Sequence, residues 1–256
     1  MSSIALARKR LEDAPWQLWA SQLVAIVRYE LRRCLGMRRS IWIYLIALAP
    51  VGFIALKLTM PRDFTLENDT LVLGATFQFY YLRLGIFFTC LGLFTVLFRG
   101  DVVEKSLHYY FLAPVRRELL VIGKFLAGLL ASSMIFVLSV WLCFVMTYAH
   151  FGEAGRSFIF NGPGLHHLLA YLSVTVLACL GYGSLFLALS LVFKNPILPG
   201  ITALGWETIH AVLPSLLQKF SVMFYLKQLC PVTIPPEGLM ALCGARALKS
   251  LLRKNQ

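Results

Sequence analysis

Five long apolar runs, separated by shorter polar segments, constrain what this chain can fold into. They cover residues 41–60, 79–98, 119–148, 167–193 and 197–217. An apolar run of about 18 residues or more with few charges is typical of a helix that crosses a bilayer. A soluble domain would carry roughly 25% charged residues, whereas this chain carries 14%. The runs therefore predict an all-α membrane protein, with a bundle of five transmembrane helices over residues 41–217.

A basic tail and an amphipathic helix are expected before the first run, over residues 1–40. Trp16 and Trp19 begin a stripe of apolar side chains at helical spacing, and Arg28 and Arg32 lie mostly on the opposite face. Tryptophan on the apolar face and arginine on the polar one are typical of a helix at the membrane–water boundary. We therefore predict that these four residues anchor the helix at the bilayer surface. The alternative is an ordinary surface helix of a soluble domain.

The distribution of Lys and Arg predicts the orientation of the bundle. The net charge is +12, but basic residues of a membrane protein gather in cytoplasmic loops, so this charge does not indicate nucleic-acid binding. Lys and Arg number eight before residue 41, one in 61–78, four in 99–118, one in 150–164 and one in 194–196. The alternation predicts a cytoplasmic amino terminus and a cytoplasmic 99–118 segment. After five crossings the tail, 218–256, lies outside the cytoplasm despite its basic residues.

The 99–118 segment is the most concentrated polar stretch between apolar runs. The residues of this segment that we expect to make the contacts are Glu104, Lys105, His108, Tyr109, Tyr110, Pro114, Arg116 and Arg117. Aromatic side chains inside a charged rim are typical of protein–protein interfaces. We predict that this segment docks on a cytoplasmic protein, and that Lys124 in the following turn projects into the cytoplasm. The alternative is a loop on lipid headgroups, with Arg116 and Arg117 binding phosphates.

The order of residues in 100–124, GDVVEKSLHYYFLAPVRRELLVIGK, resembles the first cytoplasmic loop of ABC (ATP-binding cassette) transporter permeases of the ABC-2 type. The matching positions are Glu104, Pro114, Arg116, Arg117, Gly123 and Lys124. The resemblance implies an exporting half-transporter of six spans in a bacterial cytoplasmic (inner) membrane, paired with a second permease subunit as a homodimer or heterodimer. It also implies a separate ATPase subunit docked on 99–118. Since five spans are evident, either 218–256 lies on the outer surface or a sixth span is missing from the chain.

Nucleotide chemistry is expected in the partner subunit. The sequence has no G-x-x-x-x-G-K-[ST] phosphate-binding pattern, because Gly123–Lys124 is followed by Phe125. We therefore expect this chain to be a transport subunit with no catalytic residue and no bound cofactor or metal. ATP and Mg belong to the ATPase on this interpretation.

Glu207 and His210 are three positions apart in the last apolar run. Ionisable groups inside a membrane helix are costly and are often functional. We predict a hydrogen-bonded pair that lines a translocation path, since a metal site needs three or four ligands. Two alternatives remain, an intramembrane enzyme that uses this pair and an inactive accessory membrane protein derived from a truncated permease.

Overall fold

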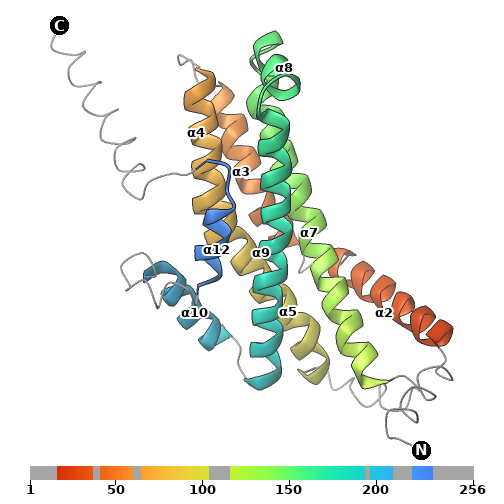
Figure 1. Ribbon diagram of the computed structural model, residues 1–256. Coiled ribbons are helices and arrows are strands. Elements are labelled where there is room, and N and C mark those ends of the chain that lie inside the picture. The colour runs from red at the N-terminus through yellow and green to blue at the C-terminus, as the bar shows by residue number, and fades with distance from the viewer. Residues whose placement is uncertain are drawn as a thin grey trace, which may run out of the picture.

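The computed structural model describes residues 16–36, 41–59, 65–103, 116–193, 197–209 and 221–232. Every regular element in these ranges is helical, and the long helices stand side by side in a bundle (Figure 1). The elements are α2 (Trp16–Gly36), α3 (Ile41–Thr59), α4 (Leu66–Thr76), η2 (Phe77–Gly85), α5 (Ile86–Val103), α7 (Arg117–Ala149), α8 (Glu153–Phe160), α9 (Gly164–Val192), α10 (Ile197–Ile209) and α12 (Val222–Gln228).

Four helices in the described ranges are long and apolar enough to cross a membrane: 41–59, 66–98, 117–149 and 164–192. The all-α membrane class is therefore confirmed. The fifth predicted span is represented by α10, which has 13 residues. Residues 210–220, which contain the rest of that span, lie outside the described ranges.

The second membrane helix begins earlier than the sequence indicates. Residues 66–78, expected as a polar loop, form α4 and the start of η2, a nine-residue π-helical segment that continues into α5. Asp69 is buried at 2% exposure and pairs with Lys57 Nζ of α3 at 2.5 Å. Because this pairing compensates the carboxylate, an acidic stretch that resembles a loop packs as helix. The 150–164 loop likewise contains a helix, α8.

Different helices lie at the two ends of the bundle. The α2 end, at the bottom of Figure 1, brings together α2, the last turn of α5 and the first turns of α7. The α8 end, at the top, carries α8 and the start of α4. The two stems of the 99–118 segment, α5 and α7, therefore leave and enter the bundle beside α2.

Small residues set the spacing of the central helices. Phe94 of α5 is fully buried, and an added Cβ at Gly128 of α7 or Gly183 of α9 would lie within 3.0 Å of its ring. The helices approach closely at both glycines, because only a residue without a side chain leaves room for the ring.

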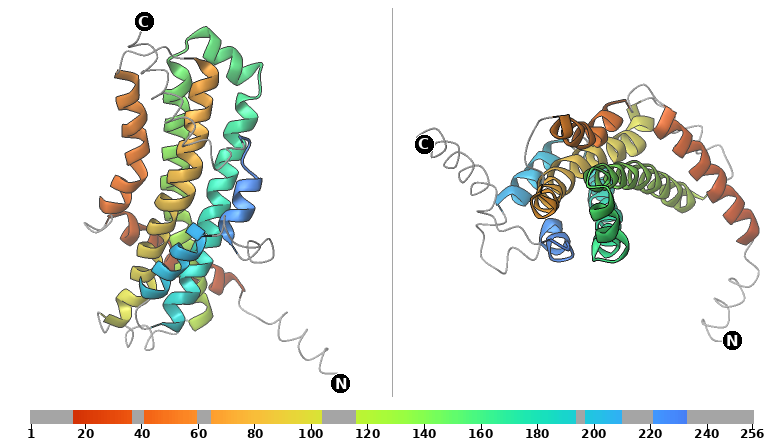
Figure 2. Two further views of the ribbon diagram at one scale, coloured as in Figure 1. Left: turned by 90° about the vertical axis from the view of Figure 1, so that its left-hand side faces the viewer. Right: turned by 90° about the horizontal axis from the view of Figure 1, so that it is seen from above.

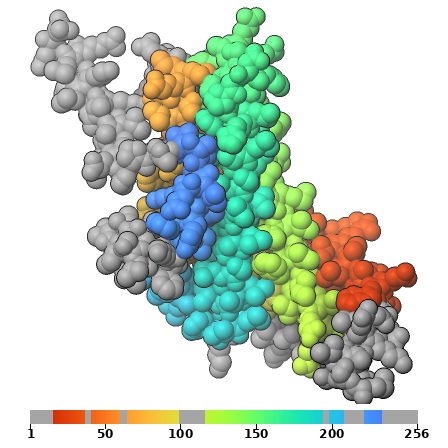
Figure 3. All heavy atoms as spheres, viewed as in Figure 1, coloured from red at the N-terminus to blue at the C-terminus, as the bar shows by residue number. Residues whose placement is uncertain are grey.

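The helix α12 lies on the surface of the bundle against α9, as Figure 3 shows, and the view from above in Figure 2 separates it from α2 by the width of the bundle. An added Cβ at Gly181 of α9 would approach Val222 to 3.0 Å. Gly181 thus faces α12 and permits its close packing on α9.

Candidate functional site

The apolar face of α2 packs against the first half of α7, with which α2 makes its main contacts. Leu23, Val27 and Leu31 are half-buried there, together with Trp19. Trp16 is 56% exposed. On the opposite face Arg28 and Arg32 are exposed, as the helical periodicity indicates. A helix of the same chain thus covers much of the apolar stripe, and the bilayer-surface role of these residues stays a prediction.

Gly123 marks a close approach between α2 and α7. A Cβ built on Gly123 would lie 2.7 Å from Ile26 Cγ2 and 3.5 Å from Leu23 Cδ1. Real Cβ atoms do not approach other atoms to 2.7 Å, so a larger residue would push the helices apart. The glycine therefore brings α2 into direct contact with the α7 backbone.

A buried ion pair fixes the same contact. Lys124 Nζ of α7 lies 3.4 Å from Glu30 Oε1 of α2, and the two side chains are 4% and 1% exposed. The same ammonium donates a hydrogen bond of 3.0 Å to the Leu97 carbonyl of α5. One side chain therefore joins α2, α5 and α7, and its charge is compensated inside the bundle. That this turn of the helix extends into the cytoplasm stays a prediction.

Glu30 is a residue of this site that the sequence pattern did not lead us to predict, although a signal was present. It lies on the apolar stripe of α2, seven residues after Leu23 and four before Cys34, where a carboxylate is unexpected. A charge on a buried face requires a partner of opposite sign. Arg33 Nη1 also approaches Glu30 Oε2, at 3.7 Å, so one carboxylate serves two cations.

Burial changes the chemistry of Cys34, which adjoins this ion pair. Desolvation, reinforced by the negative charge of Glu30 and opposed by Arg33 and Lys124, raises the pKa of the Cys34 thiol to about 11. The thiol is therefore protonated at neutral pH and behaves as a small apolar group.

Of the residues predicted to dock a partner, the structure describes Arg116 and Arg117. Arg116 precedes the first turn of α7, and its guanidinium lies 4.1 Å from the ring centroid of Trp19 on α2. Arg117 is exposed at the start of α7. The cation–π contact connects the end of the 99–118 segment to α2. Glu104, Lys105, His108, Tyr109, Tyr110 and Pro114 lie outside the described residues.

Glu207 of α10 makes the main polar contacts with the start of α12, on the side of the bundle away from α2 (Figure 2). Its carboxylate is buried and accepts hydrogen bonds from the Ser221 hydroxyl at 2.6 Å and from the amides of Val222 and Met223 at 3.0 and 3.3 Å. These groups form the start of α12, where an anion is stabilised by free amides. Glu207 therefore holds α12 against the bundle. His210, its predicted partner, lies outside the described residues.

Further polar contacts of residues 221–232 face the π-helical segment. Gln78 Nε2 of η2 donates to the Val232 carbonyl at 2.5 Å. Burial, followed by the positive charge of Arg83 in η2, lowers the pKa of Lys227. This region thus brings the side chains of Gln78, Arg83 and Lys227 to one side of the bundle. Within the described residues no group of three or more His, Cys, Asp or Glu side chains is arranged to hold a metal ion.

The length and apolar composition of the helices define a polytopic helical membrane protein. Residues 34–206 match the model of a family described as ABC-2 family transporter protein. That match covers more than half of the chain, and the chain belongs to this family. No curated protein and no solved structure gives a significant match.

Proposed function

We propose that this chain is the permease subunit of an ATP-powered exporter in a bacterial cytoplasmic membrane, with its amino terminus in the cytoplasm. A separate ATPase subunit, which binds ATP and Mg, docks on the 99–118 segment, and a second permease subunit completes the transporter. Membership of the ABC-2 family supports the permease role.

The observation that carries the proposal is that α7, one stem of the 99–118 segment, is attached both to α2 and to α5, the other stem. Lys124 contacts Glu30 of α2 and the Leu97 carbonyl of α5, and Arg116 stacks on Trp19. A displacement of the segment therefore acts on α2, α5 and α7 together. Buried ionic contacts between packed helices resist separate movement, because breaking one leaves an uncompensated charge.

The length of α7 suits the transmission of such a displacement. Its 33 residues span about 50 Å at a rise of 1.5 Å per residue, whereas the hydrocarbon core of a bilayer is about 30 Å thick. The helix therefore extends beyond the core, and a tilt at its α2 end moves its far end at the α8 end. Glu207 and His210 are the candidate residues of the path that this motion opens.

The role of Glu207 in binding the start of α12 weighs against an intramembrane enzyme. Both carboxylate oxygens accept hydrogen bonds from residues 221–223. The carboxylate is therefore engaged in holding α12 against the bundle, rather than presented to a substrate as a general base. An enzyme that used Glu207 would show activity in the purified chain alone.

The test is recovery of an ATPase with the tagged chain from native membranes, identified by mass. The wild-type chain and Glu153→Lys, which reverses an exposed charge on α8, are expected to recover the ATPase equally. Glu104→Lys is expected to reduce the recovery at least tenfold, because the interface loses a charge pair. Equal recovery by all three, or labelling of Tyr109→Cys from the outside alone, contradicts the proposal.

A further inference from the structure

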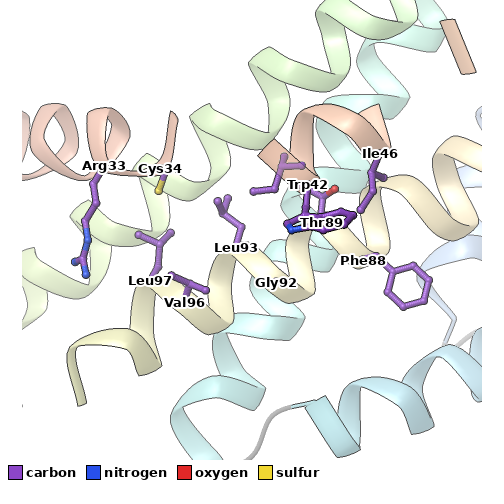
Figure 4. A pocket seen from close by; sticks show the side chains of 11 residues that line it. Arg33, Cys34, Trp42, Ile46, Phe88, Thr89, Gly92, Leu93, Val96 and Leu97 are labelled. Atoms are coloured by element: carbon purple, nitrogen blue, oxygen red, sulfur yellow. The ribbon is translucent and has the colours of Figure 1, made fainter. Parts of the chain in front are cut away.

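A cavity of about 180 Å³ lies between the last turn of α2, the first turns of α3 and the middle of α5 (Figure 4). Its wall is mostly apolar and includes Ile43 and Ile46 of α3 and Phe88, Leu93 and Val96 of α5. Trp42 and Phe88 are 69% and 40% exposed on the outer surface of the bundle. The cavity is therefore lined by residues that also face the surroundings of the bundle.

One polar group in the wall has no partner within the described residues. Thr89 Oγ1 of α5 is buried and makes no hydrogen bond, and the residue is 1% exposed. Thr70, Thr147 and Thr175, by contrast, each donate to the carbonyl four residues earlier in their helix. A buried hydroxyl without a partner is costly, so its presence in a cavity wall indicates a ligand with a hydrogen-bonding group.

The opposite end of the cavity is basic. Arg33 lines that end, beside Val96 and Leu97, and Figure 4 shows Arg33 at one end of the cavity, away from Thr89. Thr89 and Leu97 are eight residues apart on α5, which corresponds to about 12 Å along the helix. Trp42 is at the start of α3. Tryptophan is enriched at the membrane–water interface, where a membrane-spanning helix begins. On that basis we expect Arg33 at headgroup depth.

Gly92 leaves open the space between these two ends. A Cβ built on Gly92 would meet no atom within 4 Å, although the residue lines the cavity on α5. The glycine is therefore not required by contact with a neighbouring helix, unlike Gly123 or Gly128. Its effect is to keep free a volume that any larger side chain would occupy.

We propose that this cavity binds one anionic phospholipid from the surrounding leaflet. The phosphate lies beside Arg33, the Thr89 hydroxyl donates to an ester carbonyl, and hydrocarbon covers the α5 surface at Gly92. The charged headgroup matches the basic end of the cavity, and the acceptor in the glycerol region matches the Thr89 hydroxyl. The apolar chain matches the apolar wall. This site is separate from the proposed ATPase docking and does not depend on it.

The experiment uses the full chain in vesicles of equal parts phosphatidylcholine and phosphatidylglycerol, followed by detergent extraction and intact-mass measurement. The wild type is expected to retain one phosphatidylglycerol per chain. Gly92→Leu fills the cavity and is expected to lose the lipid. Gly52→Leu is the matched control, because Gly52 of α3 also has no atom within 4 Å of an added Cβ but does not line the cavity. It is expected to retain the lipid.

Two conservative variants test the polar contacts in chains that keep the cavity. Thr89→Val preserves the shape of the side chain but removes its hydroxyl. We expect lipid retention to fall about tenfold, which corresponds to the loss of one hydrogen bond between uncharged groups. Arg33→Gln is expected to abolish the preference for phosphatidylglycerol over phosphatidylcholine. Equal retention by Gly92→Leu and Gly52→Leu overturns the site. Retention of both lipids in the ratio of the vesicle by the wild type overturns the anionic assignment.

Discussion

Tyr80 of η2 donates a hydrogen bond from its hydroxyl to the main-chain carbonyl of Ile46 on α3, at 2.8 Å. Ile46 is four residues before Pro50, which lies inside α3. Proline has no N–H, so the carbonyl four residues earlier loses its helical partner. In a membrane helix such a carbonyl needs another donor, because the hydrocarbon supplies none. Tyr80 is that donor, and it connects the π-helical segment to the outermost span.

Tyr80→Phe is therefore expected to destabilise the protein by about 1 kcal/mol, the usual net value of one hydrogen bond. Thermal unfolding in detergent, followed by loss of soluble monomer, measures the change. Tyr29→Phe is the control, since Tyr29 is 62% exposed on α2, and it is expected to have no effect.

A double-mutant cycle with Pro50→Ala tests the proposed reason. Alanine at position 50 supplies an N–H to the Ile46 carbonyl, so Tyr80→Phe is expected to cost clearly less in that background. An equal cost in both backgrounds would mean that Tyr80 stabilises the protein by packing alone.

The Glu30–Lys124 pair predicts that a second substitution restores much of the stability that the first one removes. Lys124→Met leaves Glu30 in the interior with Arg33 as its remaining cation in the described residues, at 3.7 Å. Removal of one partner of a buried pair typically costs about 3–5 kcal/mol, whereas replacement of both by apolar residues is often neutral. We expect Glu30→Leu with Lys124→Met to recover most of the thermal stability that Lys124→Met loses. A double variant less stable than either single one contradicts the pairing.

The raised pKa of Cys34, about 11, predicts slow alkylation. Only the thiolate reacts, and at pH 8 the thiolate fraction is about a thousandth, rising tenfold per pH unit until the pH reaches the pKa. A single-cysteine chain that keeps Cys34 should react with maleimide much more slowly than one with Ser21→Cys, since Ser21 is exposed. Equal rates at pH 8 would place Cys34 in contact with water.

The membrane-spanning helices were predictable from sequence because a bilayer demands long apolar runs, and those at 41–59, 117–149 and 164–192 are found within a few residues of the predicted bounds. The start of the second helix was not predictable from sequence. Glu67 and Asp69 are typical of a loop, and only the structure shows that Asp69 pairs with Lys57. An ion pair between two helices cannot be predicted from the periodicity of either helix.

The candidate site was predicted from the sequence only in part. Helical spacing identified the apolar face of α2 and the exposed positions of Arg28 and Arg32. It did not show that α7 covers this face, because an amphipathic pattern reports that a face is buried and not what buries it. The π-helical form of Phe77–Gly85 also has no signature in the sequence that we can identify.

Glu207→Gln tests the attachment of α12. The amide keeps one acceptor oxygen but replaces the other with an NH2 donor. That donor faces either the amide of Val222, which donates to Oε1, or the Ser221 hydroxyl and the Met223 amide, which donate to Oε2. Hydrogen bonds to a charged group contribute about 1.5–3 kcal/mol. We expect hydrogen exchange of the 221–232 amides to accelerate at least tenfold, while exchange in α7 is unchanged. Glu153→Gln, at an exposed position of α8, is the control and should leave both rates unchanged.

Gly123 provides the sharpest test of the contact between α2 and α7. Gly123→Val adds a side chain where even a Cβ would lie 2.7 Å from Ile26 Cγ2 and 3.2 Å from Ile26 Cβ. The variant should displace α2, expose Cys34 and raise its maleimide labelling rate at pH 8 at least tenfold. Ile26→Ala removes the nearest of the two clashing atoms, so the double variant should label more slowly than Gly123→Val alone. Gly36→Val, where an added Cβ meets no atom within 4 Å, should label like the wild type. Unchanged labelling in Gly123→Val would mean that α2 does not depend on this close approach.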